Sequence, residues 1–210
     1  TQFSQHHRRA NTALVRLHVE KYVRLFVMKK QNMHVLKRSE FGDPILRAKA
    51  KKVPLKSIGT PAFNRLVADM VYTMRRANGV GLAAPQIGKS MRLAVLETRP
   101  TKMRPNLERS DVVVIVNPRI VHRSRVLQKE WEGCLSFAEV RGCVPRAKTV
   151  VVEYYDECGE KVTAAAQGLW ASIFQHEIDH LDGIGFMDRV DTKSLMTLKE
   201  FKKRVVSKRT

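Results

Sequence analysis

The sequence predicts an α+β fold in which mostly antiparallel β-sheets pack around a central helix. Two long segments repeat their apolar residues at helical spacing, and the strand-like runs follow one another without regular strand–helix alternation. At 210 residues, the chain is long enough for one domain with a substantial core. No apolar run approaches the roughly 20 residues that a membrane-spanning helix needs, so we expect no membrane span.

Residues 1–33 are expected to form a basic N-terminal extension. They contain seven Lys or Arg and one acidic residue, which gives a net charge of +6. Their interleaved apolar and basic residues could form an amphipathic helix. A basic segment of this kind is also typical of organelle transit peptides, although Glu20 and the scarcity of serine weaken that interpretation. A third alternative is a dispensable segment upstream of an internal start at Met28 or Met33.

The first helix inside the expected domain begins at Thr60-Pro61, with threonine as the cap and proline in the first turn. Asn78-Gly79 should end this helix, because glycine accepts left-handed dihedral angles. Its apolar residues follow helical spacing: Leu66, Val67, Met70, Val71 and Met74.

The middle of the chain contains several strand-like runs. The proline-containing stretch 98–110 is expected to be a loop, and Asp156–Gly159 a turn. We predict strands at 91–97, 112–116, 120–128, 149–155 and 160–167. Two further helices are predicted, the central one over 169–181 and a short C-terminal one over 193–206.

The most informative stretch lies in the predicted central helix. His176 and His180 are four positions apart, so they lie on one helix face where both imidazoles can reach one metal ion. Glu177 follows the first histidine, where a carboxylate can accept a proton from an activated water. The pattern by itself also occurs on helices whose histidines are ordinary polar residues.

The third ligand decides which chemistry the histidine pair supports. Zinc proteases continue this pattern to a third histidine or a downstream glutamate, but Phe186 occupies the histidine position and Glu200 lies in a basic tail. Cys134 is the other candidate. A thiolate with two imidazoles leaves a fourth position open, which is a catalytic arrangement. A buried free thiol is the usual alternative for a single cysteine.

Three segments together resemble the signatures of the peptide deformylase family, and the resemblance covers about residues 34–190, the expected catalytic domain. The family order is Gly-x-Gly-x-Ala-Ala-Pro-Gln, then Glu-Gly-Cys-x-Ser, then Gln-His-Glu-x-Asp-His. The matching segments here are Gly79-Val80-Gly81-Leu82-Ala83-Ala84-Pro85-Gln86, Glu132-Gly133-Cys134-Leu135-Ser136 and Gln175-His176-Glu177-Ile178-Asp179-His180. One departure follows the second segment, where Phe137-Ala138 replaces the apolar residue and proline of many members.

The resemblance implies a metal-dependent hydrolase that removes the formyl group from the N-terminal formylmethionine of new polypeptides. Cys134, His176 and His180 would hold one divalent ion, typically Fe²⁺ in cells, with Zn²⁺, Ni²⁺ or Co²⁺ as surrogates. Glu177 would transfer the proton, and the Gln86 side chain and Leu135 backbone N–H would stabilise the oxyanion.

The resemblance also suggests a substrate site. Val80, Leu169 and Ile173 would line an apolar pocket for the methionine side chain, next to Gly81, and Arg141 would lie near the peptide exit. For Leu169 and Ile173 core packing is an equally good explanation, and for Arg141 a solvated surface position. From the residues alone, we suggest that Glu132 and Asp179 orient the metal ligands through hydrogen bonds.

The charge and cysteine content suggest a class of partner and a cellular compartment. The chain carries a net charge of +19, and the predicted basic C-terminal tail, residues 191–210, contributes +5 from seven basic and two acidic residues. Basic ends favour polyanions, so ribosomal RNA is a candidate partner, against the alternative of a solvated surface. We expect no DNA partner. The three cysteines form no CxxC pair, which fits a reducing compartment: the cytoplasm, or an organelle if residues 1–33 are a transit segment.

Two rival interpretations stay open at this point. A zinc protease would need a third ligand beyond His180 and would cut within a peptide. An RNA- or ribosome-binding protein with an inactive hydrolase fold would function through its basic ends. The complete set of Cys134, His176, Glu177 and His180 argues against the second rival.

Overall fold

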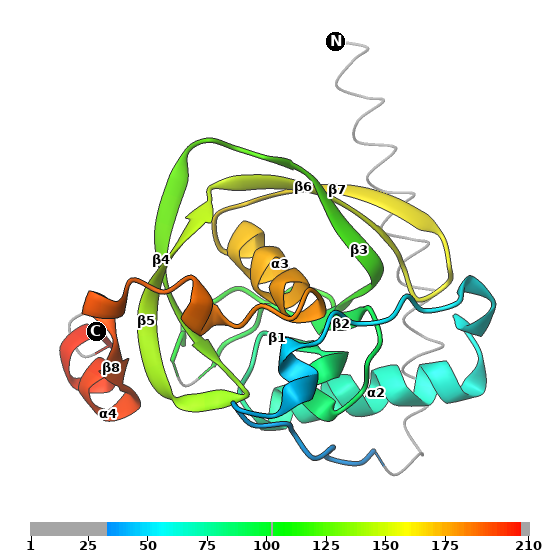
Figure 1. The fold of residues 1–210 in the computed structure, drawn as a ribbon, viewed down its shortest axis with the longest axis horizontal. Coiled ribbons are helices and arrows are strands. Elements are labelled where there is room, and N and C mark those ends of the chain that lie inside the picture. The colour runs from blue at the N-terminus through cyan, green and yellow to red at the C-terminus, as the bar shows by residue number, and fades with distance from the viewer. Residues whose placement is uncertain (1–32, 102, 207–210) are drawn as a thin grey trace. The chain divides into compact units, whose positions relative to one another are not determined.

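Two β-sheets enclose one helix in the computed structural model, which describes residues 33–101 and 103–206 (Figure 1). The first sheet has five antiparallel strands in the order β1-β2-β3-β6-β7, and the second has three in the order β4-β5-β8. Helix α3, Gly168–Leu181, packs against strands of both sheets. The α+β fold with a central helix is therefore confirmed.

The strand bounds show which sequence predictions held. In the first sheet the strands are β1 Gly81–Ala83, β2 Leu93–Leu96, β3 Val113–Arg123, β6 Thr149–Tyr155 and β7 Lys161–Gln167. In the second they are β4 Leu127–Cys134, β5 Phe137–Ala147 and β8 Met196–Thr197. The runs predicted at 91–97, 149–155 and 160–167 are confirmed within a few residues.

The prediction of separate strands at 112–116 and 120–128 was wrong. β3 is one strand that runs through both regions and ends at Arg123, and β4 begins only at Leu127. An irregularity inside β3 explains the apparent gap: Asn117 has φ of 52°, and the register with β6 shifts there. The Asn117 side chain also holds the backbone of Val53, accepting from its N–H and donating to its carbonyl at 2.8 Å each.

Helix α2, Pro61–Arg76, begins as predicted. The Thr60 hydroxyl accepts a hydrogen bond from the N–H of Phe63, and Pro61 occupies the first turn. At the other end, the left-handed residue is Asn78, with φ of 56°, rather than Gly79. Asparagine tolerates this conformation as a single residue. Gly79 is small for a different reason, because a Cβ there would lie 2.7 Å from the Leu135 side chain.

The C-terminal segment differs from the predicted helix over 193–206. It first forms a short 3₁₀ turn, Thr192–Ser194, and then β8, which pairs with Val140 and Arg141 of β5. Helix α4, Leu198–Phe201, follows and continues as a π-helical turn, Lys202–Val206. The described residues from His34 onward form one compact unit, and this segment, up to Val206, belongs to it. The division into a catalytic domain and a separate tail stays a prediction, and the proposals for residues 1–33 lie almost entirely outside the described residues.

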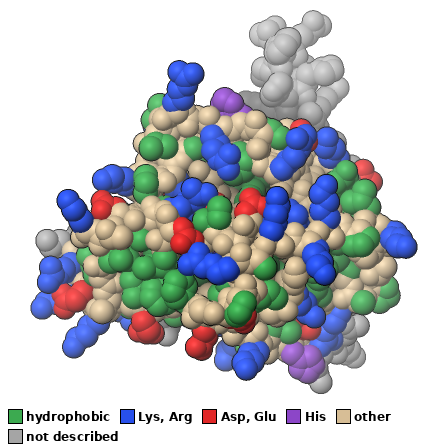
Figure 2. Space-filling model, viewed as in Figure 1, with side chains coloured by type: hydrophobic (Ala, Val, Ile, Leu, Met, Phe, Trp, Pro, Cys, Tyr) green, Lys and Arg blue, Asp and Glu red, His purple; other side chains and the backbone are tan. Residues whose placement is uncertain are grey.

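The core has two large apolar clusters. One lies between α3 and the first sheet and includes Ile173, Phe174 and Ile178. The other lies between α2 and the same sheet and includes Met70, Met74 and Leu82. Lysine and arginine side chains are spread over the visible face of the molecule, including the region over α4 (Figure 2). Among the described residues, no helix is long and apolar enough to span a membrane.

Candidate metal centre and active-site cavity

Helix α3 is buried on nearly all sides, and this burial fixes the positions of its polar residues. Apolar residues anchor it to the first sheet, while the Gln175 amide bonds the N–H and carbonyl of Ala147 on β5 at 3.1 and 3.0 Å. Gly183, with φ of +77°, ends the helix, and the N–H of Ile184 bonds the Asp179 carbonyl at 2.9 Å. His176, Glu177 and His180 are thereby held on a rigid element.

Cys134 is the last residue of β4 and lies next to the two histidines. Its Sγ is 3.2 Å from Nε2 of His180, and one ligand atom from each of the three residues lies within 4.8 Å of the others. The His176 and His180 ring centroids are 4.9 Å apart. A thiol and two imidazoles converging at this range suit a tetrahedral divalent ion with one open position. The donor set therefore fits the metal ion that the sequence predicts.

The electrostatics of this cluster favour a thiolate. Burial alone would raise the pKa of Cys134, but the charge of His180 and hydrogen bonds from His176 and His180 lower it well below its ordinary value. Burial would lower the pKa of His176, yet its hydrogen bonds to Cys134 and Glu132 raise it well above the usual range. The thiolate and the imidazoles thus stabilise each other. A bound metal cation would stabilise the thiolate in place of the imidazole protons.

A buried ionic network lies behind His176. Its Nδ1 donates to Glu132 at 2.8 Å, and Arg146 binds the same carboxylate at 2.8 and 2.9 Å. Arg146 also pairs with Asp179, which Arg189 contacts at 2.6 and 2.8 Å. Burial opposes ionisation of Glu132, but the bonds from Arg146 and His176 lower its pKa to about 2. Glu132 therefore touches a ligand directly, as suggested, whereas Asp179 connects to it only through Arg146, which the sequence did not reveal.

Glu177 lies beside the cluster with its carboxylate against the backbone of Gly81. A Cβ on Gly81 would lie 2.1 Å from Oε1 of Glu177, so only glycine fits there. Burial raises the pKa of Glu177, and the charges of His176 and His180 lower it by less. Its Oε2 is buried and has no hydrogen-bond partner among the described residues. A buried carboxyl group with a raised pKa and an unpaired oxygen can exchange a proton with a bound reactant.

Gln86 reaches the cluster from the 3₁₀ turn Ala84–Ile87 that follows β1. Its amide nitrogen lies 3.3 Å from Sγ of Cys134, while its oxygen accepts the N–H of Ala83 at 2.9 Å. The oxygen is therefore fixed on the backbone and the N–H₂ group faces the centre. Leu135 follows Cys134 directly, and its carbonyl accepts a hydrogen bond from Arg38 at 3.3 Å.

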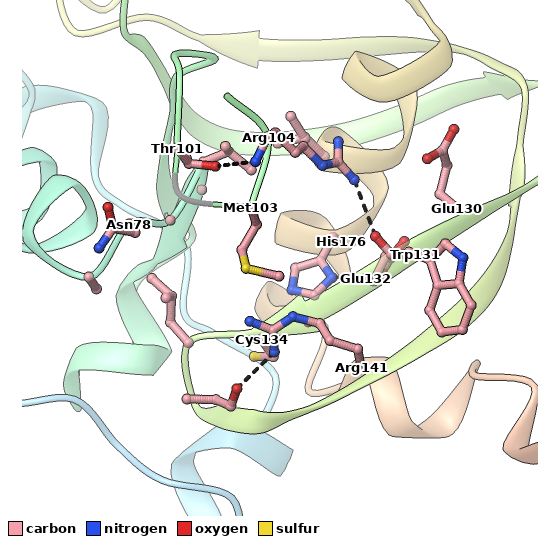
Figure 3. Close-up of a pocket in the computed structure, with 18 of the residues that line it drawn as sticks. Asn78, Thr101, Met103, Arg104, Glu130, Trp131, Glu132, Cys134, Arg141 and His176 are labelled. Carbon is pink, nitrogen blue, oxygen red and sulfur yellow. Dashed lines mark hydrogen bonds and ion pairs between the residues drawn. The ribbon is translucent and has the colours of Figure 1, made fainter. Parts of the chain in front are cut away.

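A cavity of about 900 Å³ opens over the cluster, and Figure 3 shows part of its lining. The structure brings all the predicted substrate residues to its wall: Val80, Gly81, Leu169, Ile173 and Arg141. Gln86, Cys134, Leu135, His176 and Glu177 line it too, whereas His180 does not. The Arg141 guanidinium is partly buried over Gly133 and donates to the carbonyls of Ala138 and Val140, so it is not simply solvated.

The sequence did not indicate the outer part of this cavity. Met103 from the 98–110 loop points into it toward His176, and Arg104 reaches the Trp131 carbonyl on β4 at 3.2 Å (Figure 3). Leu198 and Phe201 of α4 form a further wall. These residues come from three segments that are far apart in the sequence. The rings of Trp131 and Phe201 are in contact, with centroids 5.2 Å apart, and so join β4 to α4 at this wall.

Phe186 occupies the position where some zinc proteases carry a third histidine. It is 2% exposed and packs in an apolar cluster with Cys134 and Val144. The third donor at the centre is thus the sulfur of Cys134 and not a residue downstream of His180.

Comparison with known proteins agrees with this geometry. The sequence profile named polypeptide deformylase matches residues 35–195. Peptide deformylase 2 of Nostoc sp. is 37% identical over 179 residues, which cover 85% of this chain and 99% of that protein. The chloroplastic/mitochondrial peptide deformylase 1A of Arabidopsis thaliana is 38% identical over 75% of this chain and 62% of its own length.

Solved structures show the same likeness. The class I type b peptide deformylase of Acinetobacter baumannii with Met-Ala-Ser bound superposes with a TM-score of 0.73 and is 38% identical, covering 76% of this chain and all of that one. The profile match, the relatives and the fold agree with the Cys-His-His cluster. This chain belongs to the polypeptide deformylase family, the metal-dependent hydrolases that remove the N-formyl group from nascent peptides.

Proposed function

We propose that this chain hydrolyses the formamide bond of N-terminal formylmethionine at the centre formed by Cys134, His176 and His180, with Glu177 transferring the proton. One observation carries the proposal. A thiol from β4 and two imidazoles from α3 converge, the thiol and one imidazole line a large cavity, and a buried carboxylate lies beside them. The products are formate and a free amino terminus.

Cys134, His176 and His180 would hold one divalent ion, which supplies Lewis acidity toward water and toward a carbonyl oxygen. From the family to which the chain belongs we infer Fe²⁺ in cells, and the donor set of one soft sulfur and two borderline nitrogens would also accept Zn²⁺, Ni²⁺ or Co²⁺ as surrogates. Elemental analysis of protein purified without oxygen, compared with protein purified in air, tests this identity. Equal zinc and no iron in both samples would contradict it.

Glu177 takes a proton from the attacking water and then gives it to the departing amine nitrogen. The direction of its pKa shift supports the first step, because burial raises the pKa of this carboxylate and so makes it a stronger base toward water. The close contact with Gly81 keeps the carboxylate at the cavity wall.

Gln86 and Leu135 supply the donors for the oxyanion that forms at the formyl oxygen. The Gln86 amide nitrogen already faces the centre, since its oxygen is bonded to Ala83. The backbone N–H of Leu135 comes from the residue next to Cys134. Loss of one such donor costs about 3 kcal/mol of barrier in comparable sites.

The methionine side chain enters the apolar part of the cavity formed by Val80, Leu169 and Ile173. The position of Ile173 one helical turn before Glu177 supports this placement. Arg141 lines the cavity over Gly133, where its guanidinium can contact the peptide backbone after the first residue.

Formate release from formyl-Met-Ala-Ser tests the proposal directly. We expect turnover by the parent protein and a loss of several orders of magnitude in Glu177→Ala, with metal content retained. Internal cleavage of an unformylated peptide would favour a protease instead. A fully metal-loaded parent that binds ribosomes and releases no formate would favour the inactive RNA-binding alternative.

We further propose that the basic C-terminal segment binds ribosomal RNA. Lys193, Lys199 and Lys203 are exposed on it, and Leu198, Phe201 and Lys202 of the same segment line the cavity. Deleting residues 191–210 is a poor test, because α4 lines the cavity and β8 completes a sheet. The triple change of these lysines to Glu should reduce ribosome co-sedimentation at low salt. Lys49, Lys52 and Lys56, changed in the same way, serve as the control, and equal binding by both triple variants would refute the proposal.

For the cellular location we propose the cytoplasm, in keeping with bacterial relatives such as the Nostoc protein. The organelle alternative has support in the name of the plant relative and depends on residues 1–33. Fusion of residues 1–33 to a fluorescent protein in plant cells separates the two. Diffuse fluorescence supports the cytoplasm, and accumulation in chloroplasts or mitochondria supports the alternative.

A further inference from the structure

The short segment Gly79–Gly81 touches both the cavity and the catalytic carboxylate. Its three residues line the cavity wall. Gly79 packs against the Leu135 side chain and Gly81 against the Glu177 carboxylate, with no room for a Cβ at Gly81. A small displacement of this segment would therefore change both the width of the methionine pocket and the position of Glu177.

Arg99 holds this segment from outside the cavity. It follows β2, is only 8% exposed and does not line the cavity. Its Nη2 donates to the Gly79 carbonyl at 3.1 Å and to the Arg75 carbonyl at the end of α2 at 3.2 Å. One guanidinium thus ties the helix end to the first residue of the cavity wall.

Glu97 anchors Arg99 and is also attached to the segment. Its backbone N–H donates to the Val80 carbonyl at 2.9 Å. Its carboxylate, in a residue 1% exposed, pairs with Arg99 at 3.2 Å and accepts two bonds from Arg75 at 2.7 and 2.8 Å. Burying a carboxylate between two guanidinium groups has a large desolvation cost, and the paired groups hold one another in a fixed geometry.

We propose that Arg99, anchored by Glu97, is a positioning residue for deformylation. It fixes the Gly79 carbonyl and so sets the width of the pocket beside Val80 and the position of Glu177 against Gly81. The inference rests on the proposed function. The competing explanation is that Arg99 only caps the C-terminus of α2 by donating to the Arg75 carbonyl. In that case substitution of Arg99 would lower the stability of the protein and leave its substrate kinetics unchanged.

The test uses the full-length, metal-loaded protein and two substrates, formyl-Met-Ala-Ser and formyl-Ala-Ala-Ser. Arg99→Met keeps the length of the side chain and removes its donors. We expect KM for the methionine substrate to rise about tenfold, because a pocket misfit of this kind is worth one to two powers of ten, and the preference for methionine over alanine to fall by a similar factor. Arg99→Lys, which retains a hydrogen-bond donor, should show a smaller rise in KM and a smaller loss of the preference for methionine.

Two controls separate positioning from stability. Val67→Ala removes core volume in α2 away from the cavity, and its melting temperature calibrates the effect of destabilisation alone. Arg119→Met removes an exposed arginine of β3 that pairs with Glu153 on the neighbouring strand β6 and does not line the cavity. If Arg99→Met and Arg99→Lys lower the melting temperature as Val67→Ala does and leave KM and the methionine preference unchanged, Arg99 only closes α2 and the proposal is wrong.

Coupling between the two residues gives a further check. Glu97→Gln should weaken substrate binding in the same direction, and the double variant should lose less than the sum of the single losses. Binding of the product peptide Met-Ala-Ser, measured by calorimetry, needs no turnover. A parent that binds this peptide without releasing formate would refute the proposed function, while the change in Kd on Arg99→Met would still decide the positioning role.

Discussion

Gly81 shows how a single small residue sets the catalytic geometry. A methyl group at this position would lie 2.1 Å from Oε1 and 2.6 Å from Cδ of Glu177. Both Gly81 and Glu177 are buried, so neither can move into solvent. Gly81→Ala must therefore push the carboxylate away from its place. Because a displacement of about 1 Å can cost about 10²-fold in rate, we expect kcat for formate release to fall by about that factor. Metal content, measured in parallel, should stay near one ion per chain.

Gly79→Ala is the matched control for that substitution. Its Cβ would come closest to the flexible Leu135 side chain, at 2.7 Å from Cδ1 and 3.3 Å from Cγ, while the Gly81 carbonyl oxygen stays at 3.4 Å, so a rotamer change of Leu135 can relieve the contact. Its rate should fall much less than that of Gly81→Ala. Similar losses in the two variants would show that the Glu177 contact is not the cause.

At the scale of single residues, the sequence predicted the centre better than its surroundings. Cys134, His176 and His180 were identifiable because each belongs to a short pattern with a chemical meaning. Arg146 belongs to no pattern, although it joins Glu132 and Asp179 in the buried network. Partners 14 and 33 residues away meet it only after the strands and α3 have packed, so local spacing carries no trace of them.

At the scale of elements, strand β5 was not predicted, and its composition explains why. It contains Gly142 and Pro145, which are poor strand residues, yet Pro145 pairs with Lys129 within the hairpin. Both strands of the hairpin β4–β5 also pack against α3, a contact that local propensity does not reveal. The turn before β4, residues 124–126, also lacks glycine, proline and asparagine. Without these turn residues, 120–128 was predicted as one strand.

Helix α4 offers an element-scale prediction, because it both closes the core and lines the cavity. Phe201 is 7% exposed and packs on the Trp131 ring. Phe201→Ala should destabilise the protein to urea by about 3 kcal/mol and lower kcat/KM for formylated tripeptides, since the outer wall is lost. Lys199→Ala, at an exposed position of the same helix, should change neither quantity. A Phe201→Ala variant with unchanged kcat/KM would show that α4 does not contribute to substrate binding.

Tyr154 gives a pH-dependent prediction for the contact between β6 and α3. It packs on Phe174, with ring centroids 6.2 Å apart, and burial raises its pKa to about 12 from an ordinary value of 10.0. Between these values the unfolded chain has lost the phenolic proton and the folded chain retains it, so stability falls as pH rises. The parent should lose up to about 1 kcal/mol relative to Tyr154→Phe between pH 10 and 11 in urea unfolding. Parallel pH profiles of the two proteins would contradict this.

At the scale of the whole molecule, the metal centre lies where the two sheets meet. Cys134 comes from the three-stranded sheet, while α3, which carries both histidines, is anchored mainly on the five-stranded sheet. An ion bound by all three residues therefore links the two layers of the fold. Metal binding should stabilise the entire domain and not only the cavity, because separating the sheets would break the ligand set.

Removal of the metal tests this coupling. An ion at 1,000 times its Kd stabilises the folded state by about 4 kcal/mol, which corresponds to roughly 10 °C in the melting temperature of a domain of this size. We expect a fall of that order when a chelator is added to the zinc-loaded protein, measured by calorimetry. Cys134→Ser should lose most of the difference, because the hydroxyl is a weak ligand in place of the sulfur. Cys143→Ser, which changes a thiol outside the cluster, should keep it in full. An equal metal-dependent shift in Cys134→Ser and Cys143→Ser would mean that the ion is held elsewhere.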